Sequence, residues 1–217
     1  MPLDRNGALL SILAAMPHSN TSTERVVLFK TAWLEKLTVV SAFWFIASWS
    51  VLLPLIALAG WGAVGPLAGA ALFVAGLIVW SLFEYAVHRF VFHWHPKQSV
   101  AKWLVFVMHG NHHTQPNDPL RNLMPLVLSV PIAASVWAAC VAVMGSPGTW
   151  LFLGWISGYV AYDLVHYACH QWPMRGRWSA LKRHHMRHHH VDPEANYAIT
   201  GVFWDRVFGS RITSLKR

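Results

Sequence analysis

Four long apolar segments alternate with polar stretches along the chain. Each has roughly the 20 residues that a helix needs to cross about 30 Å of hydrocarbon. None contains Lys or Arg, and their only acidic residue is Asp163, near the end of the fourth. They run approximately over Leu37–Ala59, Trp61–Phe83, Leu123–Met144 and Thr149–Ala168. This pattern predicts four transmembrane helices.

Short breaks join these segments into two pairs. Gly60 alone separates the first pair, and Gly-Ser-Pro-Gly at 145–148 separates the second pair. Glycine and proline together are a strong turn signal. We therefore expect two helical hairpins, kinked at Pro54 and Pro131. The second helix is expected to continue through Glu84 towards His88.

The charges predict how the hairpins are oriented. All 17 Lys and Arg lie outside the apolar segments and outside the two hairpin turns. Basic residues concentrate in cytoplasmic loops, so we expect both termini to be cytoplasmic, in a bacterial inner membrane or the endoplasmic reticulum. The predicted regions are an N-terminal cytoplasmic or interfacial segment, 1–36, with a surface helix near Gly7–Met16, and a membrane domain, 37–217. The cytoplasmic cap of that domain comprises 84–122 and 169–217.

The composition agrees with a membrane protein. Hydrophobic residues make up 55% of the chain and charged residues 12%, whereas about a quarter of the residues of a soluble domain are charged. The net charge of +8 follows from the predicted topology and from attraction to anionic lipid. We therefore do not expect nucleic acid as a partner.

Ten of the fourteen histidines fall into four clusters in the polar stretches beside the apolar segments. Neutral imidazole is a common metal ligand, and ten imidazoles suit two ions with about five nitrogens each. The sequence thus predicts a dinuclear metal centre at the cytoplasmic membrane face. The clusters are His88 and His93; His109, His112 and His113; His166 and His170; and His185, His188 and His189.

The spacing within the clusters suits helices, with one exception. Residues three and four apart lie on one helix face, which fits three of the clusters. His88 and His93 are five apart and would point about 140° away from each other in an α-helix. We therefore expect the helix to end or bend between them, or the metal site to wrap around it. The other histidines are expected to be surface or loop residues: His18, His95, His184 and His190.

Two carboxylates lie one helical turn before clustered histidines. Asp163 precedes His166 by three residues, and Glu84 precedes His88 by four. A metal-bound imidazole usually donates its second N–H to a carboxylate or a carbonyl. We expect Asp163 and Glu84 to accept these hydrogen bonds, with Asp118 and Asp205 as alternatives on the polar side.

The clusters and their flanks resemble the membrane fatty acid hydroxylase and sterol desaturase superfamily. The resemblance covers about Phe83 to Ser210 and is nearest to the fatty acid 2-hydroxylases. It is carried by HRFVFH (88–93), HGNHHTQPNDPLRNLMP (109–125), YDLVHYACH (162–170), LKRHHMRHH (181–189) and FWDRVFG (203–209).

The resemblance implies an all-α integral membrane protein with four transmembrane helices and a cytoplasmic helical cap that holds a His-rich dinuclear iron site. The ten clustered histidines match the ligand positions of the family, and Tyr162 and Asp163 match positions beside the site. The implied reaction is O₂-dependent 2-hydroxylation of a fatty acyl chain from the membrane. Many eukaryotic relatives carry a fused cytochrome b5 domain, for which this chain has no room. We therefore expect a separate protein as electron donor.

Alternatives to this interpretation remain. A sterol or carotenoid oxygenase or desaturase of the same superfamily would show the same clusters. A non-enzymatic membrane protein that binds or transports metal is a different class, but transport needs polar groups near the bilayer midplane, and the apolar segments offer only Asp163 near one end. Zinc can replace iron in the purified protein, because imidazole also suits zinc and zinc binds more tightly than Fe²⁺ to many sites.

Overall fold

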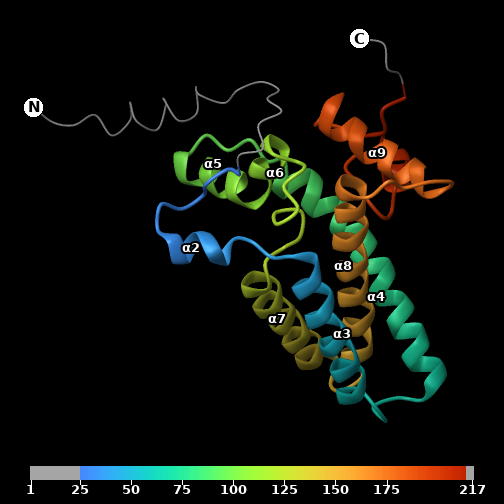
Figure 1. The fold of residues 1–217 in the computed structure, drawn as a ribbon. Helices are drawn as coiled ribbons and strands as arrows, with labels where there is room; N and C mark the ends of the chain where they lie inside the picture. Colours follow the sequence, from blue (N-terminus) through green and yellow to red (C-terminus); the bar gives the residue numbers. More distant parts are fainter. Residues whose placement is uncertain (1–24, 214–217) are drawn as a thin grey trace, which may run out of the picture.

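The computed structural model describes residues 25–213, which form a bundle of long helices beneath a cap of short ones (Figure 1). Within that range the regular structure is entirely helical, which confirms the predicted all-α class. The interfacial helix expected near Gly7–Met16 and the surface position expected for His18 lie outside the described residues.

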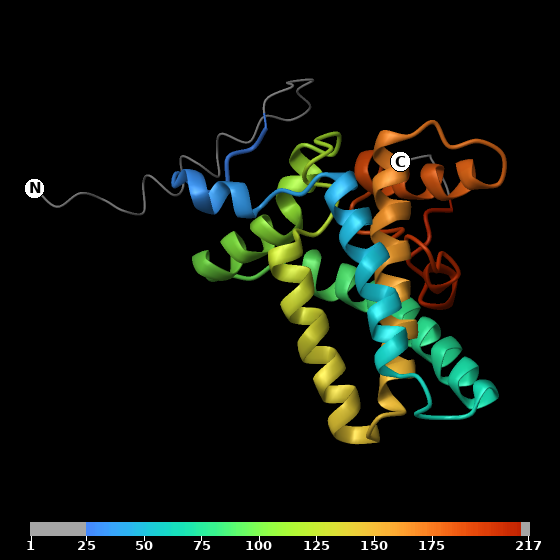
Figure 2. The same cartoon turned by 60° about the horizontal axis from the view of Figure 1, so that its bottom comes forward.

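Four long helices make the bundle, and Figure 2 shows α3 in front of α8, with α7 and α4 to either side. Shorter helices and two π-helical turns, η1 and η2, lie at its cap end. The long helices are α3 (Ala42–Ala59), α4 (Pro66–Val87), α7 (Leu126–Met144) and α8 (Gly148–Gln171). The others are α2 (Ala32–Leu37), η1 (His88–Phe92), α5 (Ser99–Val105), η2 (Phe106–Gly110), α6 (Asn111–Thr114), α9 (Trp178–His190) and α10 (Trp204–Val207).

Three of the described helices are long and apolar enough to cross a membrane: α3, α7, and α4 continued through η1 as Pro66–Phe92. The fourth predicted span, α8, has 24 residues but does not reach the same hydropathy, because it carries tyrosines, glycines and Asp163. It packs against α3, α4 and α7. A helix surrounded by protein presents little surface to lipid, so it needs less hydrophobicity than its neighbours.

Aromatic rings fill the space around α8. The ring of Tyr159 meets three others edge to face, with centroid distances of 6.2 Å to Phe45, 5.6 Å to Trp49 and 5.5 Å to Trp80. Edge-to-face pairs of this kind contribute beyond the area they bury. They join α3 and α4 to the central helix.

Glycines allow α4 and α8 to approach each other closely. A Cβ added at Gly76 would lie 2.1 Å from the carbonyl oxygen of Leu151, and one at Gly154 would lie 1.9 Å from that of Phe73. Small residues at helix interfaces in membranes let the backbones come together. This contact fixes the position of α4, which carries Glu84 and leads into His88.

Several predicted helix ends were wrong by a few residues, for local reasons. The first span begins at Ala42 instead of Leu37, because Ser41 caps it by accepting a hydrogen bond from Trp44 N (3.3 Å). The second begins at Pro66 instead of Trp61, because proline favours the first turn of a helix. It extends past Phe83 to Val87, which confirms the expected continuation towards His88.

Candidate metal centre

The ten clustered histidines converge into two groups of five, and within each group the ligand nitrogens lie within 4.8 Å of one another. No other histidine of the described residues joins either group. The first set consists of His88, His93, His109, His113 and His188. The second set consists of His112, His166, His170, His185 and His189.

A π-helical turn brings His88 and His93 into the same set. In η1 the N–H of His93 donates to the carbonyl of His88 at 3.2 Å. A hydrogen bond five residues back widens the turn by one residue compared with an α-helix, and the two ring centroids lie 5.1 Å apart. A second π-helical turn, η2, contains His109 and leads directly into α6. Such turns often occur at functional sites.

The nitrogens of the first set have the spacing of ligands around one ion. The Nε2 atoms of His88 and His109 are 3.0 Å apart, those of His109 and His113 2.9 Å, and those of His113 and His188 3.2 Å. Ligands at right angles on an ion with metal–nitrogen bonds near 2.1 Å lie about 3.0 Å apart. The residues therefore fit a metal ion.

Hydrogen bonds alone do not account for this chain of contacts. His88 and His188 donate their Nδ1 hydrogens to the carbonyls of Tyr197 and Ala195, so their Nε2 atoms carry lone pairs. His109 and His113 would each have to donate Nε2–H to one of these ends, which leaves two N–H groups facing each other at the central contact. A bound cation removes the conflict, because the Nε2 atoms of all four rings can then direct a lone pair at it. Nε2 of His93, buried without a hydrogen-bond partner in the described part of the chain, supplies a fifth.

The second set has the same spacing. Nε2 of His112 lies 2.9 Å from that of His166 and 3.0 Å from that of His189. Nε2 of His185 lies 3.0 Å from that of His189 and 2.8 Å from that of His170. The neighbours His112 and His113 belong to different sets, as do His188 and His189. The four histidine clusters of the sequence therefore do not correspond one to one to the two sets in the structure.

Burial keeps the imidazoles of His93 and His188 neutral. It lowers the pKa of His93 to about 4 and that of His188 to about 4. A histidine must be deprotonated at the binding nitrogen to hold a metal. At neutral pH both rings are in that form.

The expected carboxylate partners do not contact the imidazoles. His88 donates to the carbonyl of Tyr197, and His166 to the carbonyl of Asn122 at 3.0 Å. Glu84 instead accepts the backbone N–H groups of Ile199 (2.8 Å) and Thr200 (2.7 Å). The expectation for Glu84 and Asp163 was wrong because buried backbone N–H groups also need acceptors, and Asp163 accepts from Met124 N at 3.1 Å.

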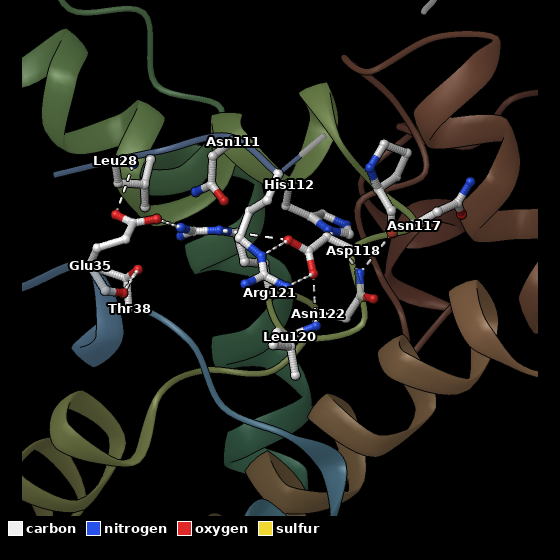
Figure 3. Close-up of polar contacts among 12 residues, drawn as sticks. Leu28, Glu35, Thr38, Asn111, His112, Asn117, Asp118, Leu120, Arg121 and Asn122 are labelled. Atoms are coloured by element: carbon white, nitrogen blue, oxygen red, sulfur yellow. Dashed lines mark hydrogen bonds and ion pairs between the residues drawn. The ribbon is translucent and has the colours of Figure 1, made fainter. Parts of the chain in front are cut away.

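The two polar-side alternatives also bind other partners. Figure 3 shows Asp118 beside Arg121, which forms an ion pair with Glu35 of α2. Asp118 forms an ion pair with Arg25 (2.6 Å) and accepts from Leu120 N at 3.0 Å. These pairs tie the segment before α3 to the loop that follows α6.

Asp205 accepts from His184 Nε2 at 2.9 Å. His184 is therefore a partly buried residue of the cap rather than the surface residue that was predicted. His95 and His190 are exposed, as predicted.

The two remaining candidate residues lie beside the second set. Tyr162 stacks on the ring of His166, with a centroid distance of 6.1 Å and an interplanar angle of 9°. Asp163 is buried one turn before His166 and holds the backbone at Met124. The carbonyl groups of Asn122, Ala195 and Tyr197 were missed, because a backbone acceptor leaves no signal in the residue type.

Comparison with known proteins agrees with this geometry. The family model described as fatty acid hydroxylase matches residues 73–210. The ceramide very long chain fatty acid hydroxylase of Saccharomyces cerevisiae is 36% identical over 145 residues, covering 64% of this chain and 37% of the yeast protein. The fatty acid 2-hydroxylase of Homo sapiens is 37% identical over 144 residues, covering 63% of this chain and 38% of the human protein. A dihydroceramide fatty acyl 2-hydroxylase of Arabidopsis thaliana is 36% identical over 144 residues, covering 65% and 60%.

The fold is also similar to a solved structure. The structure described as full-length Scs7p, with only the hydroxylase domain visible, matches with a TM-score of 0.78 and 30% identity, covering 85% of this chain and 71% of that one. The matched region spans only about two fifths of the length of the yeast and human relatives. Because the family model covers well over half of the chain and contains all ten clustered histidines, the chain belongs to the fatty acid hydroxylase family.

Proposed function

We propose that this protein is an O₂-dependent lipid hydroxylase that adds a hydroxyl group to carbon 2 of a fatty acyl chain. The observation that carries the proposal is the pair of five-nitrogen histidine sets at the cap end of an apolar helix bundle. Relatives named as fatty acid and fatty acyl 2-hydroxylases support the choice of reaction and substrate.

The ten histidines would hold two iron ions, one in each set. Iron bound there would supply the reduction of O₂ that attack on an unactivated C–H bond requires, since side chains alone cannot supply it. The all-nitrogen ligand sets would also accept zinc in the purified protein. The Tyr162 ring lies parallel to the His166 ring, and we propose that it shields this histidine and borders the acyl chain. Asp163 then acts by holding the backbone at Met124.

The balance of the reaction requires a reductant. One oxygen atom of O₂ enters the C–H bond and the other leaves as water, which consumes two electrons and two protons. We propose that a separate redox protein delivers the electrons. Exposed basic residues at the cap, Arg175, Arg177 and Arg183, support an acidic donor, because complementary charge steers association.

We further propose that α8 is the fourth membrane span and that the two histidine sets face the cytoplasm. The support is that α8 runs beside the three apolar helices and that neither hairpin turn carries Lys or Arg. An acyl chain dissolved in the bilayer would then reach the site from the apolar bundle. The division into a segment 1–36 and a membrane domain 37–217 remains part of this proposal.

Cysteine labelling tests the topology. Gly65 and Ser146 are exposed in the two hairpin turns, and Ser99 is exposed in the cap. Gly65 suits substitution because a Cβ there would have no atom within 4 Å, whereas one at Gly148 would lie 2.2 Å from the Cys140 carbonyl oxygen. In a background lacking Cys140 and Cys169, cysteines at Gly65 and Ser146 should react with an impermeant reagent only from the extracytoplasmic side. Labelling of Ser99→Cys from that same side would contradict the two-hairpin topology.

Lipid analysis tests the reaction. Cells that lack 2-hydroxylated lipids should accumulate 2-hydroxy acyl chains when they express the protein with a competent redox donor. Mass spectrometry of hydrolysed lipids measures the product and the position of its hydroxyl group. Hydroxylated sterol or carotenoid with unchanged acyl chains would instead place the protein in another branch of the superfamily.

A further inference from the structure

Two separate loops supply the carbonyl groups that orient the metal-binding imidazoles. In the loop 195–200, the carbonyl of Ala195 accepts from His188 Nδ1 at 2.8 Å and that of Tyr197 accepts from His88 Nδ1. Both rings belong to the first set. In the loop 116–124, the carbonyl of Asn122 accepts from His166 Nδ1 at 3.0 Å, and this ring belongs to the second set. The Asn122 side chain lies beside His112, another ring of that set.

Buried carboxylates hold the loop 195–200 through its backbone. Oδ1 of Asp205 accepts from Tyr197 N (2.9 Å) and Ser210 Oγ (2.7 Å), and Oδ2 accepts from Ala198 N (2.9 Å) and His184 Nε2 (2.9 Å). Asp205 is fully buried. Glu84 holds the other end of the loop at the N–H groups of Ile199 and Thr200. The carbonyls at Ala195 and Tyr197 therefore have little freedom to turn away from their imidazoles.

A different side chain holds the loop 116–124. The Asn122 amide donates to the carbonyl of Pro116 at 2.8 Å and accepts from Gln171 Nε2 at 2.7 Å, so it joins the loop to the end of α8. In Figure 3 its side chain lies between the Asn117 region and Asp118, close to His112. Asn122 is 2% exposed. This loop shares none of these contacts with the loop 195–200.

We propose that Asp205 and Asn122 are positioning residues, each for one metal ion: Asp205 for the ion of the first set and Asn122 for the ion of the second. The inference rests on the two metal sites of the proposed function. Asp205 contacts none of the ten clustered histidines and acts through the carbonyls of its loop. Partners that orient ligands typically contribute 10–100-fold to metal affinity.

The substitution Asp205→Asn tests this effect while keeping the size of the side chain. Both carboxylate oxygens already accept from two donors each. An amide places an NH₂ group against one of these donor pairs, and a buried donor without an acceptor is costly. The loop should shift and weaken the hydrogen bonds to His88 and His188, while the second set keeps its own loop.

Metal binding to the purified protein in detergent tests the proposal, with chelator competition and elemental analysis as readouts. The wild type should hold two ions, and Asp205→Asn should bind one of them about 10–100-fold more weakly. Asn122→Ala should do the same for the other ion. Histidine variants identify which ion is affected. Added to His166→Ala, Asp205→Asn should weaken the remaining first-set ion by the same factor. Added to His188→Ala, it should change the remaining second-set ion little, and Asn122→Ala should show the reverse pattern.

Asp192→Asn is the matched control. Asp192 precedes the same loop and accepts from Glu194 N at 3.0 Å, but it is not fully buried. This variant should keep both ions at wild-type affinity. If Asp205→Asn does not fold, Ser210→Ala removes only one of the four donors and should weaken the first ion alone, by less. Equal weakening of both ions, or wild-type affinities in a folded variant, would overturn the proposal. A wild-type protein that binds no metal would instead reject the proposed function.

Discussion

Replacing His188 with alanine should reduce the bound metal and abolish lipid hydroxylation. His188 is completely buried, its Nε2 lies 3.2 Å from that of His113, and its Nδ1 donates to the carbonyl of Ala195. Alanine removes one of the five nitrogens of the first set and leaves that carbonyl without its donor. Elemental analysis of the purified protein should show a loss of about one ion, and product should fall below detection.

His190→Ala is the control for this substitution. His190 lies on the same helix two residues later, but it is exposed and belongs to neither set. This variant should keep wild-type metal content and activity. Equal metal content in His188→Ala and His190→Ala would contradict the assignment of the first set.

Replacing Gly154 with alanine should strongly destabilise the bundle. The new Cβ would lie 1.9 Å from the carbonyl oxygen of Phe73, so α4 and α8 would have to separate along their contact. We expect a loss of about 3 kcal/mol or more, at the upper end of overpacking effects. The melting temperature in detergent measures it, and metal content should fall as well, because α4 leads to His88 and α8 carries His166 and His170.

A second glycine provides the comparison. A Cβ at Gly65 would have no atom within 4 Å, and its backbone is in an ordinary extended conformation. Gly65→Ala should melt close to the wild type. Equal melting temperatures for Gly154→Ala and Gly65→Ala would show that the close packing of α4 and α8 contributes little to the stability of the bundle.

The fold class and the gathering of the clustered histidines were predictable because they depend on local patterns. Apolar length locates the long helices, and histidine spacing identifies all ten residues of the two sets. The grouping was not predictable, since the neighbours His112 and His113 contribute to different sets. That division depends on how α6, α8 and α9 meet in three dimensions. The π-helical turn that aligns His93 with His88 likewise changes the helix period on which sequence reasoning relies.

The carboxylates show a second limit of sequence reasoning. Asp163 and Glu84 lie one turn from clustered histidines, which led to the expectation of a direct contact. The backbone N–H groups of Met124, Ile199 and Thr200 occupy these carboxylates instead. Helical spacing predicts which side chains share a face, but it does not predict which loop will fold against that face. These carboxylates therefore contact loop backbone instead of the clustered histidines.

The source of the added oxygen tests the central claim most directly. Cells expressing the protein with a redox donor should be grown under ¹⁸O₂, and their acyl chains analysed by mass spectrometry. The proposed function predicts 2-hydroxy acyl chains that carry one labelled oxygen, and no such product from cells expressing His170→Ala, even though that variant reaches the membrane. Product labelled from H₂¹⁸O instead of ¹⁸O₂ would contradict the oxygenase mechanism.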